Sequence, residues 1–459
     1  MKQELSSQRV AFYTLGCKVN QYDTEAVAEL FAREGWQIVE FSEPADVYII
    51  NTCTVTNMGD RKSRQIIRRA VRQNPEAAVV VMGCYAQVAP GEVAEIEGVD
   101  LVVGTNERGR LVDLVREFTT SGKRQFVVND IFQTIEFEDL PITQFKGRTR
   151  ATIKIQEGCN EFCSYCKIPY ARGRSRSRPL ESVVAEVKRL EAAGFSEVVL
   201  TGIHLGAYGR DLDGKLELAD VLSAVAQSTE IPRIRISSID PHEVTPRFIQ
   251  VMEEHPNICR HLHIPLQGGH DEILRAMRRR YTLAEYQRTV EQLREVFPEI
   301  ALTTDIIVGF PGETEDQFAS SLQFVEAMGF SRLHVFRYSR RSGTPAAKLA
   351  NQVSVAEKQE RSQRMLELGQ RLALRYHEGF LQRSLPVLFE EPASEETVAV
   401  AVGSTPTLAP DEQLWEGLTD NYIRVLAPAA GDVSGRILPV RLQGASEDLM
   451  VGQIEKNSQ

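Results

Sequence analysis

Three cysteines in one short segment have a spacing that suits metal chemistry. Cys159, Cys163 and Cys166 all stand in EGCNEFCSYC. Three thiolates from one loop can hold three irons of a [4Fe–4S] cluster and leave the fourth iron open to a substrate or cofactor. The alternative is a zinc site whose fourth ligand, His204 or His263, comes from elsewhere in the chain.

Three more cysteines are far apart in the sequence but recur at the same kind of place. Cys17, Cys53 and Cys84 each directly follow a strand-like run, namely VAFYTLG, DVYIINT and AAVVVMG. Because the carboxyl ends of parallel strands meet in one crevice, these thiols could reach one ion or cluster, again with one position unfilled. The alternative is three unrelated buried thiols. Cys259 has no partner pattern and is predicted to be a core residue.

Composition limits the class of protein. The chain has 459 residues, of which 42% are hydrophobic, enough for two or three domains. We find no apolar run long enough to span a bilayer, and MKQELSSQRV lacks the apolar segment of a signal peptide. We therefore expect a cytoplasmic protein, in which clustered thiols bind metal more often than they form disulfides. The net charge of −10 excludes a uniformly basic nucleic-acid coat but leaves room for local basic patches.

The elements that must position the separated cysteines form an alternating series. From residue 9 to about 117, strand-like apolar runs alternate with helical patterns such as those at 24–35 and 59–73. This alternation predicts an open parallel sheet with helices on both faces. An acidic, irregular stretch at 133–150 is predicted to be a linker.

A second alternating series contains the clustered cysteines. Strand-like runs occur at 151–156, 197–203, 233–239, 260–266, 301–310 and 332–338. With helices between them, these runs predict a partial barrel with its site at the carboxyl ends of the strands, closed by a helix at 356–380. Short strand patterns at 385–391, 396–403, 414–428 and 435–444 then predict a small all-β module.

The motifs together resemble those of the methylthiotransferase family of radical S-adenosylmethionine (SAM) enzymes, over nearly the whole chain. The resemblance lies in LGCKVNQYDTEA, INTCTVT, GCYAQ and EGCNEFCSYCKIPYARGRSRSR, and it includes Tyr165 before the third clustered cysteine. These motifs are most similar to the branch that modifies N6-threonylcarbamoyladenosine at tRNA position 37. The isopentenyladenosine branch usually reads GCQMN where this chain reads GCKVN, and the ribosomal-protein branch tends to read GCPKN.

The resemblance implies an α/β fold of three domains. These are an amino-terminal auxiliary-cluster domain at 8–120, a radical SAM partial (β/α)6 barrel at 145–376, and a small RNA-binding TRAM barrel at 378–446. It also implies two [4Fe–4S] clusters. The cluster on Cys159, Cys163 and Cys166 would bind SAM and cleave it reductively to a 5′-deoxyadenosyl radical. The cluster on Cys17, Cys53 and Cys84 would carry the sulfur that is methylated by a further SAM and inserted at adenine C2.

The expected partners are the tRNA anticodon loop around position 37 and an electron donor of unspecified identity, with no membrane. The residues expected around SAM follow strand ends of the barrel: Tyr165, Thr201, Gly202, Ser237, Ser238, Gln267, Ile307, Gly309 and Phe310. The alternative for each is ordinary barrel packing or a polar loop. Arg279 is a candidate contact for the SAM carboxylate or for RNA, with a solvated helix face as the alternative.

Local basic runs flank both sets of cysteines and suggest RNA contacts. Arg61, Arg64, Arg68 and Arg72 share one helical face after Cys53, and Arg172, Arg174, Arg176 and Arg178 follow Cys166. The second run could also bind the threonylcarbamoyl carboxylate. In the all-β module, Tyr422 and Arg424 are candidate RNA contacts. A charge run on its own is more often a solvated face.

Two rival functions follow from these alternatives. The nearer rival is a methylthiotransferase acting on isopentenyladenosine tRNA or on a ribosomal protein. The remote rival is a non-enzymatic RNA-binding protein with structural zinc, which would be colourless where an iron–sulfur protein is brown.

Overall fold

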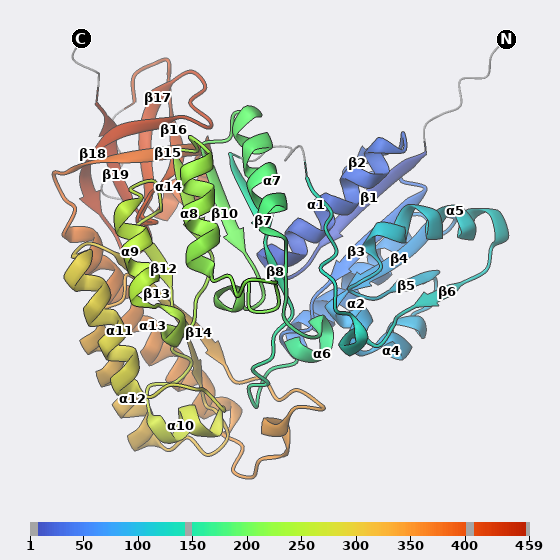
Figure 1. Cartoon of the computed structure of the whole chain (residues 1–459), viewed down its shortest axis with the longest axis horizontal. Coiled ribbons are helices and arrows are strands. Elements are labelled where there is room, and N and C mark those ends of the chain that lie inside the picture. Colours follow the sequence, from blue (N-terminus) through green and yellow to red (C-terminus); the bar gives the residue numbers. More distant parts are fainter. Residues whose placement is uncertain (1–7, 143–148, 401–407, 456–459) are drawn as a thin grey trace.

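The computed structural model describes residues 8–142, 149–400 and 408–455. Figure 1 shows three parts: an amino-terminal domain in blue and cyan, a core in green, yellow and orange, and a red terminal barrel at the carboxyl end. The expected start of the core domain at residue 145 lies outside the described residues. No helix in the described part of the chain is long and apolar enough to cross a membrane.

The amino-terminal domain is built on a six-stranded parallel sheet in the order β2-β1-β3-β4-β5-β6. Its strands are β1 (Arg9–Thr14), β2 (Gln37–Val39), β3 (Val47–Thr52), β4 (Ala78–Gly83), β5 (Leu101–Val103) and β6 (Gln125–Val127). Its helices are α1 (Lys18–Arg33), α2 (Asn57–Gln73), α3 (Cys84–Val88), α4 (Pro90–Ala94) and α5 (Leu111–Ser121). β3 and β4 are buried along their whole length because helices cover both faces of the sheet.

The core is a partial barrel of six parallel strands. They are β7 (Arg150–Lys154), β10 (Glu197–Thr201), β11 (Arg233–Ile236), β12 (His261–His263), β13 (Ala301–Val308) and β14 (Arg332–Arg337). They form two three-stranded sheets, joined by a parallel bridge between Ile234 and Ile258. The short strands β8 (Gln156–Glu157) and β9 (Arg176–Ser177) pair beside β7. The predicted partial barrel is therefore confirmed.

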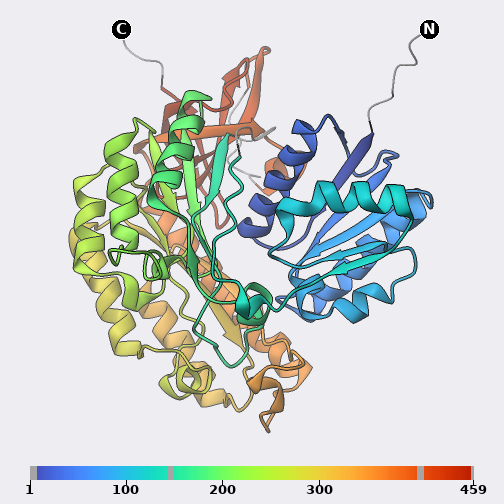
Figure 2. The same cartoon turned by 45° about the vertical axis from the view of Figure 1, so that its right-hand side comes forward.

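Helices cover the outside of the core. They are α6 (Ile168–Arg172), α7 (Leu180–Ala192), α8 (Leu218–Ser228), α9 (Pro246–Glu254), α10 (Asp271–Ala276), α11 (Leu283–Val296), α12 (Glu315–Met328) and α13 (Val355–Glu378). Short 3-10 helices occur at Arg108–Arg110, Ile131–Gln133, Leu205–Ala207, Pro241–Glu243 and Pro345–Lys348. One large apolar core joins the strands to these helices and takes in Tyr22 of α1, so the two domains pack on each other. In Figure 2, α1 lies on the side of its domain that faces the green strands.

The carboxyl end is a closed five-stranded barrel in the order β15-β16-β17-β19-β18, as the predicted all-β module requires. Its strands are β15 (Ser384–Pro392), β16 (Glu412–Thr419), β17 (Arg424–Ala430), β18 (Ile437–Ala445) and β19 (Met450–Ile454). β19 extends the barrel beyond the predicted end at residue 446.

The strand predicted at 396–403 is wrong in its described part. Residues 395–400 form the short helix α14 (Glu395–Val400), and residues 401–403 lie outside the described residues. Ser394 starts this helix, because its hydroxyl accepts a hydrogen bond from the Thr397 amide at 3.2 Å.

Candidate active site

Cys17, Cys53 and Cys84, here called the amino-terminal triad, follow three adjacent parallel strands of one sheet. Cys17 caps α1 after β1, Cys53 follows β3, and Cys84 begins α3 after β4. Cys17 is exposed, Cys53 is partly buried and Cys84 is buried, so the triad opens on the Cys17 side. The structure therefore brings the three separated cysteines to one sheet edge.

Two observations place the sulfurs of this triad close together. Gly16 has a φ of +109°, and a Cβ added to it would lie 3.2 Å from Sγ of Cys53, so the loop carrying Cys17 presses on Cys53. Burial raises the pKa of Cys84 to about 11; Arg172 opposes the shift, and the neighbouring Cys17 and Cys53 add to it. The thiols thus interact electrostatically.

Cys159, Cys163 and Cys166, here called the core triad, lie on the loop after β8. Gly158 begins this loop with a φ of +75°, where a Cβ would overlap the Arg174 carbonyl. The loop is fixed on both sides: the Cys159 amide donates to the Gly173 carbonyl at 3.0 Å, and the Ser164 amide donates to the Met277 carbonyl at 3.0 Å. The three cysteines therefore lie on a loop that backbone hydrogen bonds hold in place at the carboxyl ends of the core strands.

Charged side chains surround the core triad. Nη1 of Arg279 donates to Sγ of Cys163 at 3.3 Å, and its Nη2 pairs with Asp240 at 2.5 Å. Burial alone would lower the pKa of His204, but contact with Cys159 and Glu243 raises it to about 10. Arg279 is thus neither an RNA contact nor a solvated residue, because its buried side chain supports the triad.

The two histidines considered as zinc ligands have other partners. Nε2 of His204 lies 3.0 Å from the Glu243 carboxylate, and the imidazole also contacts Cys159. In His263, Nδ1 lies 2.9 Å from the Thr303 hydroxyl and Nε2 lies 3.3 Å from Asp305. His204 thus contacts the core triad, whereas His263 is engaged by Thr303 and Asp305.

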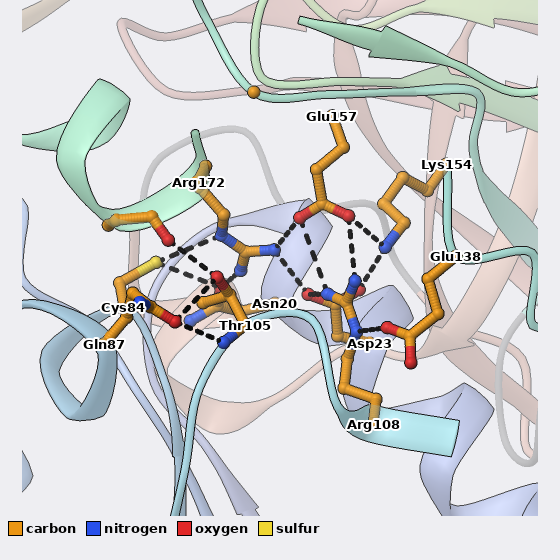
Figure 3. Close-up of polar contacts among 12 residues, drawn as sticks. Asn20, Asp23, Cys84, Gln87, Thr105, Arg108, Glu138, Lys154, Glu157 and Arg172 are labelled. Atoms are coloured by element: carbon orange, nitrogen blue, oxygen red, sulfur yellow. Dashed lines mark hydrogen bonds and ion pairs between the residues drawn. The ribbon is translucent and has the colours of Figure 1, made fainter. Parts of the chain in front are cut away.

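A single peptide segment joins the two triads. Arg172 ends α6, and its Nε donates to Sγ of Cys84 at 3.2 Å, while the next residue, Gly173, accepts from Cys159. Figure 3 shows the Arg172 guanidinium between Cys84 on one side and Glu157 on the other. Arg172 is fully buried and also contacts Asn20 and Asp23 of α1. One side chain of the core thus reaches the sulfur of the other domain.

Behind Arg172 lies a buried network of charges that sequence reasoning missed. Asp23 accepts from Lys154 at 2.5 Å, from Arg108 at 2.6 Å and from Arg172 at 2.7 Å, and Glu157 pairs with the same three cations. Burial alone would raise the pKa of Asp23, but the three cations lower it below its usual value. The sequence does contain a sign of this network, because Lys154 interrupts an apolar strand and Asp23 lies on an apolar helix face.

A second contact reaches the amino-terminal triad from the other end of the core. Arg341, in the loop after β14, is buried; it donates to the hydroxyl of Thr54 at 2.7 Å and pairs with Asp60 at 2.7 Å. Thr54 is the residue after Cys53. The core therefore holds the loops of both Cys53 and Cys84.

The residues predicted around SAM are gathered on the inner side of the strand ends. Tyr165 and Ile307 pack in one small apolar cluster with Phe310, and the Gln267 amide donates to the Asp305 carbonyl at 2.8 Å. Gln267 has a φ of +65°, Gly309 has a φ of +69°, and Thr201 and Gly202 end β10 beside Gln156. Ser237 and Ser238 are partly buried after β11. The Phe310 ring is fully buried, so it supports this wall from behind.

The predicted RNA-binding face of α2 exists as a surface. Arg61, Arg68 and Arg72 are exposed, while Arg64 is partly buried and donates to the Tyr85 hydroxyl at 2.9 Å. The Thr56 side chain caps this helix directly after the Cys53 loop. Three of the four arginines are thus exposed, and Arg61 is the one near the start of the helix that follows the Cys53 loop.

The second basic run does not form the expected surface. Arg172, Arg176 and Arg178 are buried, and only Arg174 of this run is exposed. Arg178 pairs with Glu186 and with Asp139, the latter at 2.7 Å. Arg172 and Arg178 pair with carboxylates inside the protein, and buried Arg176 donates to the carbonyls of Thr134 and Arg174, so these three residues do not form a surface for phosphate or a substrate carboxylate.

Tyr422 also differs from the prediction. Its ring stacks on His261 with centroids 4.6 Å apart, and the Arg235 guanidinium lies 4.7 Å from its centroid. Arg235 and Arg233 donate to backbone carbonyls of the terminal barrel, including Leu418 at 2.8 Å. Tyr422 therefore closes the bottom of the core rather than lying on an RNA-facing surface. Arg424 is partly exposed and pairs with Glu416 at 2.9 Å.

The donors present fit two iron–sulfur clusters with an added small molecule. Within the described ranges, no three His, Cys, Asp or Glu side chains are grouped so that they could hold a single metal ion. A [4Fe–4S] cluster does not require such a group, because each cysteine thiolate binds a different iron. The Ser237 hydroxyl is buried, and none of the described residues is its hydrogen-bond partner. An unpaired buried hydroxyl at these strand ends suits a polar ligand such as SAM.

Two family models match the chain. Residues 153–325 match the model described as the radical SAM superfamily, and residues 9–104 match the uncharacterized protein family UPF0004. The first range contains the core triad and the second contains the amino-terminal triad.

Curated relatives match over most of the chain. A protein of Bacillus subtilis named threonylcarbamoyladenosine tRNA methylthiotransferase MtaB is 43% identical, over 97% of this chain and 96% of its own length. A protein of the same name from Aquifex aeolicus is 41% identical over 81% of this chain and 90% of its own. A tRNA-2-methylthio-N(6)-dimethylallyladenosine synthase from Moorella thermoacetica is 35% identical, over 96% of this chain and 97% of its own length.

Among solved structures, the fold resembles the radical SAM methyltransferase TsrM from Kitasatospora setae, solved with cobalamin and a [4Fe–4S] cluster. The TM-score is 0.58 at 17% identity, and the match covers 74% of this chain and 77% of that one. At this identity the likeness concerns the fold alone.

Proposed function

The chain belongs to the radical SAM tRNA methylthiotransferases, and from this premise we propose that it puts a methylthio group on C2 of N6-threonylcarbamoyladenosine at position 37 of tRNA. The observation that carries the proposal is the pair of cysteine triads joined through Arg172 and Gly173. Replacing an aromatic C–H by C–S needs both an activating centre and a sulfur donor. Two triads on facing loops supply a place for each.

The core triad would hold the cluster that binds SAM, and the amino-terminal triad would hold the second [4Fe–4S] cluster. When bound, these groups supply the 5′-deoxyadenosyl radical and the inserted sulfur. The protein holds the triads in place through Arg279 and Arg172, which donate to Cys163 and Cys84. Ser237 offers its free hydroxyl to SAM, and Tyr165 and Ile307 offer an apolar wall to the adenine.

The substrate is proposed to reach the site from the side of the exposed Cys17. Arg61, Arg68 and Arg72 on α2, the helix after Cys53, and Arg174 after α6 are exposed, and we assign them to the tRNA phosphates. Position 37 lies in a loop, so its base can enter without melting a long duplex. An electron donor from the cell supplies the reducing electron, and we place the enzyme in the cytoplasm with its tRNA.

The test is a side-by-side assay with two defined tRNAs, one carrying threonylcarbamoyladenosine and one carrying isopentenyladenosine. Reconstituted enzyme with SAM and a reductant should add the methylthio group to the first tRNA only, as measured by mass spectrometry of the nucleosides. The opposite preference would move the protein to the isopentenyladenosine branch. Absence of product from both tRNAs would overturn the proposed function.

A further inference from the structure

A polar cavity of about 480 Å³ lies where α1, the inner faces of the core strands and the terminal barrel meet. Lys18 of α1, Thr152 of β7, Thr303 of β13, Arg332 of β14 and Tyr422 all contribute to its wall. The three parts of the protein thus share this cavity, and its volume suits a small polar group.

Lys18 connects the cavity to the amino-terminal triad. It is the first residue of α1 and directly follows Cys17, the exposed cysteine of that triad. Its side chain is partly buried, and none of the hydrogen bonds or ion pairs found among the described residues involves its ammonium group.

The other charges of the cavity divide into paired and unpaired groups. Arg150 pairs with Glu390 at 2.7 Å, and Arg424 pairs with Glu416 at 2.9 Å. Arg332, like Lys18, makes no ion pair with a described residue. The remaining carboxylates of the wall are exposed on the terminal barrel: Glu391, Glu447 and Asp448.

The inner wall near the two unpaired cations also carries His334 of β14. Burial lowers the pKa of His334 on β14, and the nearby His263, Arg332 and Lys18 lower it further, while Asp305 opposes them. Asp305 is already engaged by His263 at 3.3 Å. An anion that enters here would find cations without partners.

The distance from the cavity to the proposed SAM site can be judged along β13. Thr303 in its wall and Ile307 beside the proposed SAM site are both inward-facing positions of β13. Four residues of extended strand separate them, a distance of about 13 Å. An adenine whose C2 lies between the two triads could therefore extend its N6 substituent into the cavity.

We propose that this cavity is the subsite for the N6 substituent of the substrate adenosine and that Lys18 binds its carboxylate, with Arg332 as a second cation. This inference rests on the proposed function, because a threonylcarbamoyl group carries a carboxylate. An ammonium–carboxylate pair in a partly buried site is a strong, charge-assisted contact. An uncharged isopentenyl group would leave both cations without a partner, and this disfavours it.

The experiment uses two synthetic anticodon stem-loops, one with threonylcarbamoyladenosine and one with its methyl ester, which has the same shape but no charge. Binding to reconstituted holoenzyme is measured by fluorescence anisotropy without reductant, and kcat/KM is measured with reductant. The wild-type protein should bind the acid more tightly than the ester. Lys18→Gln should weaken binding of the acid by about tenfold or more and leave the ester unchanged. Lys18→Arg should keep most of the preference.

Lys188→Gln is the matched control, since Lys188 is an exposed lysine of α7, and it should bind both loops as the wild type does. Arg332→Gln should also reduce the preference for the acid over the ester. If Lys18→Gln loses the iron of the neighbouring cluster, the result for Arg332→Gln tests the proposed subsite instead. Equal wild-type affinity for acid and ester overturns the inference even when both loops are methylthiolated. Failure to methylthiolate either loop instead overturns the proposed function.

Discussion

Arg172 of the core donates a hydrogen bond from Nε to Sγ of Cys84 in the amino-terminal domain, across 3.2 Å. The next residue, Gly173, accepts from the Cys159 amide at 3.0 Å. Two consecutive residues therefore contact one cysteine of each triad, and a substitution at Arg172 is expected to affect both triads.

Replacing Arg172 should change the electronic properties of the cluster on the amino-terminal triad. Arg172→Lys removes the planar group that contacts Cys84, Asp23 and Asn20 at once. Because hydrogen bonds to cluster sulfurs help to set the reduction potential, we expect the potential of this cluster to fall. A redox titration followed by electron paramagnetic resonance measures it. Arg174→Lys, at an exposed neighbouring position, should leave the potential unchanged; an unchanged potential in Arg172→Lys would count against the contact.

Removing Asp23 should destabilise the joint between the two domains. Asp23→Asn leaves Arg108, Lys154 and Arg172 without one carboxylate, and breaking a buried ion pair costs about 3–5 kcal/mol. Urea unfolding near neutral pH measures this loss, with the exposed Asp113→Asn as control.

The loss should depend on pH in a defined direction. The folded protein lowers the pKa of Asp23, so its stabilising effect is fully present above about pH 4. It disappears as the pH falls through the lower pKa of the folded state. A difference between wild type and Asp23→Asn that grows on acidification would contradict this.

The two triads serve as controls for each other. The wild-type protein should hold roughly eight irons, four at each cluster, and changing either triad to Ala should leave about half of them. Loss of Cys159, Cys163 and Cys166 should abolish SAM cleavage. Loss of Cys17, Cys53 and Cys84 should spare cleavage to 5′-deoxyadenosine and end methylthiolation. A folded amino-terminal variant that keeps its remaining cluster but no longer cleaves SAM would contradict this division.

The exposed arginines of α2 should bind tRNA through phosphate. Arg61→Glu and Arg68→Glu should each weaken tRNA binding and flatten its dependence on salt, because fewer counterions are released. Arg288→Glu, an equally drastic change on the exposed face of α11, should have little effect. SAM cleavage without tRNA should persist in all three variants. If the Arg61→Glu and Arg68→Glu variants bind tRNA as tightly as the Arg288→Glu variant, the exposed face of α2 does not bind tRNA.

The positions of the separated cysteines could be predicted from the sequence because strand ends determine where they lie. Cys17, Cys53 and Cys84 follow apolar runs that could only be buried strands, and parallel strands bring their carboxyl ends together. The same rule predicts Ser237, Gln267 and Ile307 around SAM, since each follows or ends a core strand.

Contacts between domains were not predictable in the same way. Arg172, Arg176 and Arg178 form a basic run in the sequence, yet all three are buried, and Arg172 pairs with Asp23 of the other domain. Their even spacing was a hint, since alternate residues of a strand share one face. Tyr422 was likewise misread, because nothing local indicates that the terminal barrel inserts this ring against His261.

Nucleoside mass spectrometry of tRNA from cells that lack this gene tests the proposed function most directly. We expect 2-methylthio-N6-threonylcarbamoyladenosine to disappear and N6-threonylcarbamoyladenosine to accumulate. The wild-type gene should restore the product, and the Cys17→Ala gene should not. An unchanged level of the methylthio nucleoside, or loss of the isopentenyl counterpart in its place, would contradict the proposed function.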